Sequence, residues 1–435
     1  MAKATVQGKS PSLAGDRSVT VAAVVVIIMI CALWSVTNPW PGFTTLLSTP
    51  NTKFASKCVT SRDCAGDLRH DPPETTFYDD PNLSYTIEKP VKKWDDKRRQ
   101  WLKRHPSFAA GAGERVLLLT GSQPSPCKNP IGDHLNLRFF KNKVDYCRLH
   151  GYDIFYNNVH LHQKMRSYWA KIPLVRAAMV AHPEAEWLWW VDSDAVFTDM
   201  DFKVPLKRYE DHNLVVHGWP KEVYEKKSWV AINAGIFLIR NCQWSMDFLE
   251  VWASMGPHTP NYKKWGQTLR STLKDKLFPE SDDQSGLVYL LLKEREKWGN
   301  KIYIENEYDL HGYWLGIVGK LDTFAERYVT MERKVHELRR RHAEVESESY
   351  GGLREQYIEE GGNNSSWRRP FITHFTGCQP CSGRHNPSYG GDSCWIGIER
   401  ALNFADNQVL RKFGFVHSEL ENSSAVSPLP FDFPA

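Results

Sequence analysis

The segment from Trp187 to Asp199, WLWWVDSDAVFTD, constrains the fold of this chain more than any other. Its apolar run is long enough for a strand that is buried on both faces, and such strands are typical of parallel sheets in α/β proteins. The run stops at Asp192 and Asp194, whose carboxylates are one residue apart. Ligands of α/β proteins bind at the carboxyl ends of the strands, and carboxylate oxygens bind hard cations. The segment therefore predicts a metal site at the edge of a buried sheet.

Taken alone, an Asp-x-Asp pair more often closes a turn or caps a helix than binds a metal. The surrounding residues favour a metal here. Ala195, Val196 and Phe197 resume the apolar stretch, so buried chain flanks the pair on both sides. A buried pair of like charges is costly unless a cation or hydrogen-bond donors neutralise it.

The composition is that of a globular protein. The 435 residues, 41% of them hydrophobic, are enough for one large or two ordinary domains. A net charge of +4, spread over charges of both signs, and the lack of a recognisable nucleic-acid-binding motif argue against DNA or RNA as a partner. The chain has 17 Trp and 17 Tyr, which suit stacking on sugar rings, although core packing accounts for most of them.

Residues 19–36 carry no charge and are just long enough to cross a bilayer. Lys3, Lys9 and Arg17 precede this run, and no Lys or Arg follows until Lys53, so the positive-inside rule places the N-terminus in the cytosol. A cleaved signal peptide is the alternative, but its apolar region is usually shorter. We therefore predict a type II signal anchor with a lumenal catalytic domain.

The shifts in composition give the expected organisation. The chain divides into a cytosolic tail (1–18), a transmembrane anchor (19–36), a lumenal stem rich in Pro, Asp and Lys (37–112), a catalytic domain (113–425) and a C-terminal tail (426–435).

Eight cysteines lie outside the anchor, an even number that is compatible with disulfides in an oxidising lumen. They are Cys58, Cys64, Cys127, Cys147, Cys242, Cys378, Cys381 and Cys394. The last three, with His374, also resemble a zinc site, although disulfides are the better interpretation in this compartment. Four N-x-S sequons, at Asn82, Asn363, Asn364 and Asn422, agree with a lumenal location.

Strand and helix patterns alternate through the catalytic domain. Strands are expected at 114–122, 152–156, 187–191, 213–216, 231–239 and 301–305, and helices at 92–104, 135–150, 167–181, 243–255 and 283–295. Such alternation implies βαβ crossovers, and therefore an α/β fold with a mostly parallel central sheet flanked by helices.

Other polar and small residues are expected at the same edge as the aspartates. Gly121 and Ser122 end the first strand, where small residues let the backbone approach a nucleotide. The segment Ile232–Gly235 interrupts a strand with an amide and two small residues, which suits either the close approach of a sugar or a β-bulge. The segment Ser281–Gln284 has one acid more than a helix N-cap needs. His374 adds an imidazole, and two carboxylates with one imidazole suit Mn²⁺ better than Ca²⁺.

From about residue 116 to 415 the chain resembles plant glycosyltransferase family 34. The motifs that carry the resemblance are VLLLTGSQPSPCKNPIGDH, NKVDYCRLHGYDIFYN, WLWWVDSDAVFTDM, NLVVHGW, DDQSGLVYLLL, HGYWLG, THFTGCQPC and RALNFADNQVL. The resemblance implies a GT-A-type fold, a type II protein of the Golgi membrane, and Mn²⁺-dependent transfer from UDP-sugars to hemicellulose with α-1,6 linkage and retention.

The resemblance also implies roles for individual residues. Asp192, Asp194 and His374 would bind the metal. Ten residues would bind the UDP-sugar: Gly121, Ser122, Lys171, Ser193, Ala234, Gly235, His311, Gly312, Gly377 and Gln379. Asn233, Asp282, Asp283 and Gln284 would serve catalysis, and the last three would face the sugar and the acceptor. The implied mechanism is front-face attack, with double displacement through Asp283 as the alternative.

Two substrate classes compete within that family, galactosyl transfer to mannan and xylosyl transfer to the glucan of xyloglucan. Gln379 and Ala234 stand where xylosyltransferases typically have lysine and threonine, so the resemblance favours UDP-galactose and the galactomannan branch. Mannan synthase or a second copy of the chain would be a protein partner. A catalytically silent Golgi partner is the alternative from another class. We expect Trp219, Tyr313 and Trp314 to line the acceptor groove.

Overall fold

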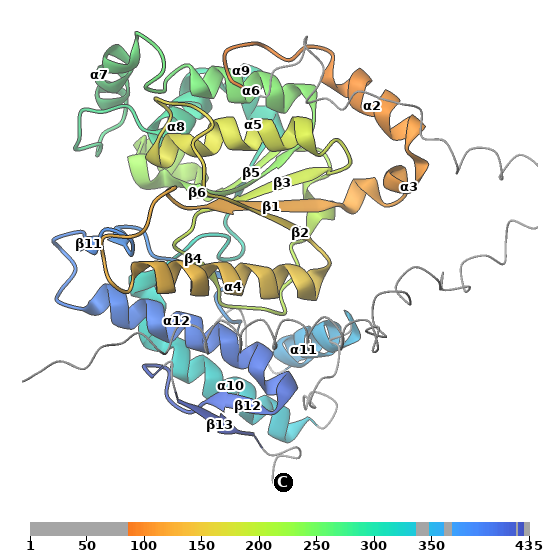
Figure 1. Ribbon diagram of the computed structural model, residues 1–435, viewed down its shortest axis with the longest axis vertical. Coiled ribbons are helices and arrows are strands. Elements are labelled where there is room, and N and C mark those ends of the chain that lie inside the picture. The colour runs from red at the N-terminus through yellow and green to blue at the C-terminus, as the bar shows by residue number, and fades with distance from the viewer. Residues whose placement is uncertain (1–85, 336–347, 361–367, 423–424, 430–435) are drawn as a thin grey trace, which may run out of the picture. The chain divides into compact units, whose positions relative to one another are not determined.

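The computed structural model describes residues 86–335, 348–360, 368–422 and 425–429. A six-stranded sheet lies at its centre, in the order β2-β1-β3-β6-β5-β7 (Figure 1). The strands are β1 (Val116–Gly121), β2 (Asp153–Asn157), β3 (Trp187–Val191), β5 (Leu214–Gly218), β6 (Ile232–Arg240) and β7 (Ile302–Glu305). Only β6 runs against its neighbours, β3 and β5. The predicted α/β fold with a mostly parallel sheet is confirmed.

Helices cover both faces of this sheet. They are α2 (Trp94–Arg104), α3 (Pro106–Ala109), α4 (Gly132–His150), α5 (Lys171–Ala181), α6 (Gln243–Ala253), α7 (Tyr262–Thr272), α8 (Asp283–Lys293), α9 (Arg295–Trp298), α10 (Leu321–Lys334), α11 (Glu348–Glu360) and α12 (Ser393–Leu410). Figure 1 shows α5, α6 and α8 on one face, and α4 on the other between the sheet and α12.

The alternation of buried residues along each strand explains why both faces of the sheet are covered. Along β1, Leu117 and Leu119 belong to one hydrophobic core, and Val116 and Leu118 to the other. Successive side chains of a strand point to opposite faces, so a strand that is apolar throughout needs a cover on both sides. This is why the central strands are continuous apolar runs rather than alternating ones.

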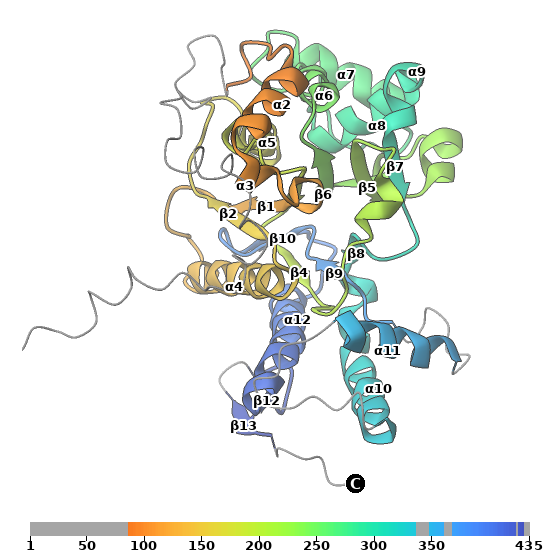
Figure 2. The same cartoon turned by 90° about the vertical axis from the view of Figure 1, so that its right-hand side faces the viewer.

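A second sheet has three short strands in the order β4-β9-β8: β4 (Ala195–Phe197), β8 (Gly312–Tyr313) and β9 (Ile372–His374). It lies beside α4 and below the central sheet in Figure 2. Antiparallel pairing of β4 with β9 sets Ala195 opposite His374. This pairing carries a histidine from late in the chain to the start of the strand that follows the two aspartates.

The remaining strands form two antiparallel two-stranded ribbons. One pairs β10 (Cys378–Gln379) with β11 (Arg384–His385), and the other pairs β12 (Phe415–His417) with β13 (Val426–Pro428). The first three residues of the predicted C-terminal tail therefore pair with the domain, because β13 completes a ribbon with β12.

The packed domain also begins before the boundary predicted at residue 113. Trp94, at the start of α2, is completely buried, and its indole nitrogen donates to the side-chain oxygen of Asn241 at 2.7 Å. Arg98 forms an ion pair with Glu186 at 2.9 Å. The high charge of this helix hid its one packed face. The predicted anchor at 19–36 and most of the predicted stem lie outside the described residues. Within the described ranges, no helix is long and apolar enough to cross a membrane.

Two disulfides tie the C-terminal part of the domain together, Cys127–Cys381 and Cys378–Cys394. The zinc alternative is wrong, because three of its four candidate ligands are cysteines held in these bonds. Cys147 and Cys242 are free, so only part of the even set is paired among the described residues. Cys58 and Cys64, which also belong to the even set, lie outside the described residues.

Candidate active site

Two carboxylates and one imidazole meet where the two sheets adjoin. Asp192 and Asp194 follow β3, and β9 ends with His374. The Nε2 atom of His374 lies 3.2 Å from Oδ1 of Asp194 and 3.8 Å from Oδ2 of Asp192. One potential ligand atom from each residue lies within 4.8 Å of the others. The predicted ligands are thus brought together. Asp192, Asp194 and His374 form a group that can hold a metal ion (the metal group).

A glycine is required beside this group. A Cβ atom on Gly235 would lie 2.4 Å from Cε1 of His374 and 2.6 Å from Oδ2 of Asp192. The carbonyl of Gly235 accepts a hydrogen bond from the Asp192 amide at 2.9 Å. The pairing of β5 with β6 also shifts register here, so the interruption at 232–235 is both a β-bulge and a close approach to the site. The space kept by Gly235 fits the use of these side chains as ligands.

A second histidine supports the first. The Nδ1 atoms of His311 and His374 are 2.9 Å apart, which is a hydrogen bond in which one ring donates and the other accepts. If His374 donates, its Nε2 keeps the lone pair that a metal needs. Burial, and then the neighbouring His374 and His217, hold the pKa of His311 well below the usual value for histidine. His311, predicted to bind the UDP-sugar, therefore lies behind His374 and makes a hydrogen bond to a predicted metal ligand.

Lys171 connects three of the predicted motifs. Its ammonium group is buried and lies 3.3 Å from Oδ1 of Asp192 and 2.8 Å from Oδ2 of Asp283. It also donates to the carbonyl of Ala234 at 2.9 Å. Burial raises the pKa of Asp283 to about 6, against the opposite effect of Lys171. Burial would lower the pKa of Lys171, but the two carboxylates outweigh it and the pKa is raised.

The other predicted catalytic residues mostly hold the backbone in place. Asp282 is the N-cap of α8, and its carboxylate accepts from the backbone of Ser285 at 2.9 Å and pairs with Lys276 at 2.5 Å. Gln284 donates to the carbonyl of Trp229 and accepts from the amide of Ala234. The side chain of Asn233 accepts from the amide of Gly235 at 2.9 Å. These contacts favour a structural role for Asp282 and leave Asp283 as the acid of this motif that adjoins the metal group through Lys171.

The remaining residues predicted to bind the UDP-sugar divide into two groups. Leu119 and Trp190 are paired between β1 and β3, so Gly121 and Ser122 follow at the same edge as Asp192, as expected. Ser193 lies between the aspartates.

The second group consists of Gly312, Gly377 and Gln379, which contact other loop segments. Gly377 has φ +84°, and a Cβ there would meet the ring of Tyr389 at 2.9 Å. A Cβ on Gly312 would meet the carbonyl of Ile372 at 2.6 Å, so this glycine serves the packing of β8 on β9. Gln379 is exposed, and its side-chain oxygen accepts from Ser382. Of the three aromatic residues expected in the acceptor groove, Trp314 is buried, and Trp219 and Tyr313 are exposed.

Two contacts around the aspartates were missed from the sequence. Lys143 of α4 is completely buried, and its ammonium group donates to the carbonyls of Ala195 at 2.7 Å and Ser193 at 3.1 Å. Burial lowers its pKa to about 7, against the effect of Asp194 and Asp192. The indole of Trp190 donates to Oδ1 of Asp192 at 2.6 Å. A lysine inside a charged helix gave no signal of this, whereas Trp190, two residues before Asp192, was noted only as a strand residue.

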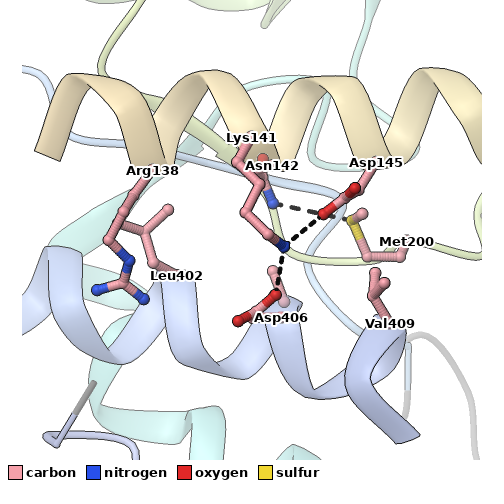
Figure 3. Close-up of a pocket in the computed structure, with 9 residues that line it drawn as sticks. Arg138, Lys141, Asn142, Asp145, Met200, Leu402, Asp406 and Val409 are labelled. Atoms are coloured by element: carbon pink, nitrogen blue, oxygen red, sulfur yellow. Dashed lines mark hydrogen bonds and ion pairs between the residues drawn. The ribbon is translucent and has the colours of Figure 1, made fainter. Parts of the chain in front are cut away.

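Two hollows elsewhere are not part of this site. A cavity of about 20 Å³ lies between α4 and α12, where Lys141 pairs with Asp145 at 2.6 Å and Asp406 at 2.7 Å (Figure 3). It has room for about one water molecule. An open hollow of about 1620 Å³ is lined by residues that include Arg115 and Tyr152, at the starts of β1 and β2, the edge opposite the aspartates.

Two carboxylates and an imidazole at the carboxyl edge of an α/β sheet, with a buried lysine and a further acid beside them, are typical of enzymes that hold a diphosphate through a metal ion. Residues 112–385 match the galactosyl transferase GMA12/MNN10 family, and the chain belongs to this family. It is therefore a glycosyltransferase.

Three plant relatives give the degree of similarity. Glycosyltransferase 6 of Arabidopsis thaliana is 64% identical over 85% of this chain and 87% of its own length. Galactomannan galactosyltransferase 1 of Cyamopsis tetragonoloba is 56% identical over the whole of both chains. Probable xyloglucan 6-xylosyltransferase 3 of Arabidopsis thaliana is 46% identical over 81% of this chain and 69% of its own length.

Proposed function

We propose that this chain transfers galactose from UDP-galactose to the C6 hydroxyl of mannose units in the mannan backbone of galactomannan, with retention of the α configuration. The observation that carries the proposal is the 56% identity, over the whole of both chains, to a relative named galactomannan galactosyltransferase 1. The similarity to the relative named a xyloglucan 6-xylosyltransferase is lower and covers less of both chains.

The residues of the site suit this reaction on a GT-A-type fold. Asp192, Asp194 and His374 would hold Mn²⁺, which when bound would neutralise the charge of the diphosphate leaving group. Lys171 fixes Asp283 through their 2.8 Å ion pair, and Gln284 fixes the bulge through the amide of Ala234. These contacts keep the carboxylate and the bulge in place while the donor binds.

In the proposed front-face reaction, the acceptor hydroxyl forms a bond to the anomeric carbon on the side from which UDP leaves. The bond from that carbon to the diphosphate oxygen breaks, and this oxygen takes the hydroxyl proton. The ionised carboxylate of Asp283 would stabilise the positive charge that develops on the sugar. In the double displacement, Asp283 would instead form a covalent bond to the sugar.

The small side chain at the bulge supports the proposed preference for galactose. Galactose has a C6 hydroxymethyl group that xylose lacks, so its binding needs extra space. Ala234 is buried at the bulge and has a small side chain, and Lys171 binds its carbonyl group. Ala234→Thr is therefore expected to reduce the use of UDP-galactose more than that of UDP-xylose.

The test is a transfer assay with the full-length chain purified in detergent. UDP-galactose and UDP-xylose are each offered with Mn²⁺ to manno- and cello-oligosaccharides, and Asp194→Ala serves as the inactive control. Galactose on mannan acceptors alone supports the proposal. Xylose on glucan acceptors would assign the chain to the xyloglucan reaction, and the absence of all transfer would favour a non-catalytic Golgi partner.

We also propose that the chain is a type II protein of the Golgi membrane, anchored by residues 19–36. The uncharged run and the lysines before it support this topology. Protection of the catalytic domain from protease in sealed Golgi vesicles would support it, and digestion without detergent would contradict it. Mannan synthase and a second copy of the chain are the partners to seek by crosslinking in the same vesicles.

A further inference from the structure

Two exposed aromatic side chains are connected to the metal group, one directly and one through two histidine rings. Trp219, directly after β5, is 47% exposed, and Tyr313 of β8 is 44% exposed. The parallel pairing of β8 with β9 sets Tyr313 opposite His374, so the two side chains share one face of the small sheet. Tyr313 is therefore a direct neighbour of a predicted metal ligand.

Trp219 is connected to the same ligand through two histidine rings. His217 lies edge-on to Trp219, with ring centres 5.0 Å apart, and 5.7 Å from the ring of His311. His311 in turn lies 4.9 Å from His374. An aromatic row therefore runs from the metal group outward to an exposed tryptophan, and Trp219 marks its far end.

Both exposed rings are held from behind. The hydroxyl groups of Tyr313 and Tyr389 are 3.0 Å apart, and Tyr389 donates to the carbonyl of Thr376 at 2.9 Å. The ring of Trp219 packs edge-on against the buried ring of His217, and its backbone amide donates to the carbonyl of Ala231 at 2.9 Å. Single exposed apolar side chains are common on protein surfaces and need no function. Two that are held in place, one next to His374 and the other at the outer end of the aromatic row, are better explained as a prepared binding surface, because little entropy is lost when a ligand stacks on them.

We propose that Trp219 and Tyr313 form two acceptor subsites that bind the sugar rings of the polysaccharide backbone. The proposal rests on the proposed glycosyl transfer, since the acceptor must lie beside the donor at the metal group. Pyranose rings expose a face of C–H groups that packs on an aromatic ring, and the neutral backbone needs no charged partner. Tyr313 serves the near subsite, and Trp219 serves the subsite for sugars further along the chain.

This arrangement predicts that the effect of Trp219 depends on acceptor length. Long manno-oligosaccharides reach Trp219 and short ones do not. Trp219→Ala should raise KM about tenfold for long acceptors and leave KM for the shortest active acceptor unchanged. Trp219→Phe should restore most of the loss, because a phenyl ring still stacks. Tyr313→Ala should raise KM for acceptors of every length.

Two further measurements separate acceptor binding from other causes. Hydrolysis of the UDP-sugar without acceptor, and KM for the donor, should stay unchanged in both alanine variants. Phe415→Ala is the matched control, since Phe415 is 46% exposed and lies on β12 of the C-terminal ribbon. It should leave every parameter unchanged.

A uniform loss over all acceptor lengths in Trp219→Ala, a changed KM for the donor, or no change at all would overturn the proposal. A changed oligomeric state with normal acceptor kinetics would overturn it too, and would identify an interface between copies of the chain. If wild type uses glucan acceptors instead, the series is run with cello-oligosaccharides, and the subsites stand or fall independently of the mannan assignment. If wild type transfers nothing, binding of the same oligosaccharides is measured by calorimetry, and equal affinities of wild type and Trp219→Ala would reject the subsites.

Discussion

Gly235→Ala is the substitution whose effect on the site follows most directly from the geometry. The added methyl group would lie 2.4 Å from Cε1 of His374 and 2.6 Å from Oδ2 of Asp192. Favourable contacts between non-bonded carbon atoms are about 3.5–4.0 Å long, so two of the three predicted ligands must move by about 1 Å. The backbone at Gly235 has no positive φ, so alanine causes no strain there beyond the contact itself.

A displacement of about 1 Å at a reacting group lowers the rate by about 10²-fold, which is about 2.7 kcal/mol of transition-state stabilisation. We therefore expect sugar transfer to fall at least about 100-fold and Mn²⁺ to bind more weakly. The fold should survive, because overpacking of this kind costs about 1–3 kcal/mol of the free energy of unfolding.

The assay for this variant has three parts: calorimetric titration with Mn²⁺, transfer kinetics over a range of Mn²⁺ concentrations, and thermal unfolding. Gly316→Ala is the matched control, since a Cβ at Gly316 meets nothing within 4 Å and the residue ends the HGYWLG motif that contains His311. Its metal affinity and rate should equal those of wild type. A Gly235→Ala variant with normal Mn²⁺ affinity and a normal rate would refute the assignment of the ligands.

Three further predictions concern the support of the site. Lys143→Met removes the ammonium group that donates to the carbonyls of Ser193 and Ala195, so calorimetry should give Mn²⁺ binding that is about 10-fold weaker. Unchanged affinity would show that Lys143 only fills space. Trp190→Phe loses the 2.6 Å hydrogen bond to Asp192, so kcat/KM should fall by about tenfold with little change in melting temperature, and an unchanged rate would contradict this. Cys127→Ser combined with Cys381→Ser should lower the free energy of unfolding in urea by about 2–5 kcal/mol, and reductant should have a smaller effect on the variant than on wild type. Equal stability of the two proteins would show that this bond constrains little.

The sequence predicted the elements whose signals are local. The strand at Trp187–Val191 was predicted to the residue, because an apolar run that stops at two acids fixes both its nature and its end. The position of Gly121 beside Asp192 followed from the rule that parallel strands end at one edge. The chemistry of His374 made it a candidate ligand and the family motif assigned it, but nothing in its own segment indicates that β9 pairs with β4.

The parts that the sequence did not predict depend on contacts between distant segments. Lys143 precedes Ser193 by 50 residues, and the pattern of α4 does not distinguish a buried lysine from an exposed one. The pairing of Cys127 with Cys381 spans 254 residues and cannot be deduced from an even number of cysteines. The second acid of the Ser281–Gln284 segment was surplus to a cap, but the ion pairs of Asp282 with Lys276 and of Asp283 with Lys171 join segments that the local pattern does not connect.

The central claim is that the group of Asp192, Asp194 and His374 supports retaining galactosyl transfer to mannan. The most direct measurement is NMR spectroscopy of the product formed from UDP-galactose labelled with ¹³C in the sugar and a manno-oligosaccharide, with wild type and with Asp194→Ala, each with and without Mn²⁺. Our account predicts an α-anomeric galactose on C6 of mannose, formed by wild type with Mn²⁺ and absent from the other three reactions. A β-anomeric product, or equal transfer by Asp194→Ala, would contradict it.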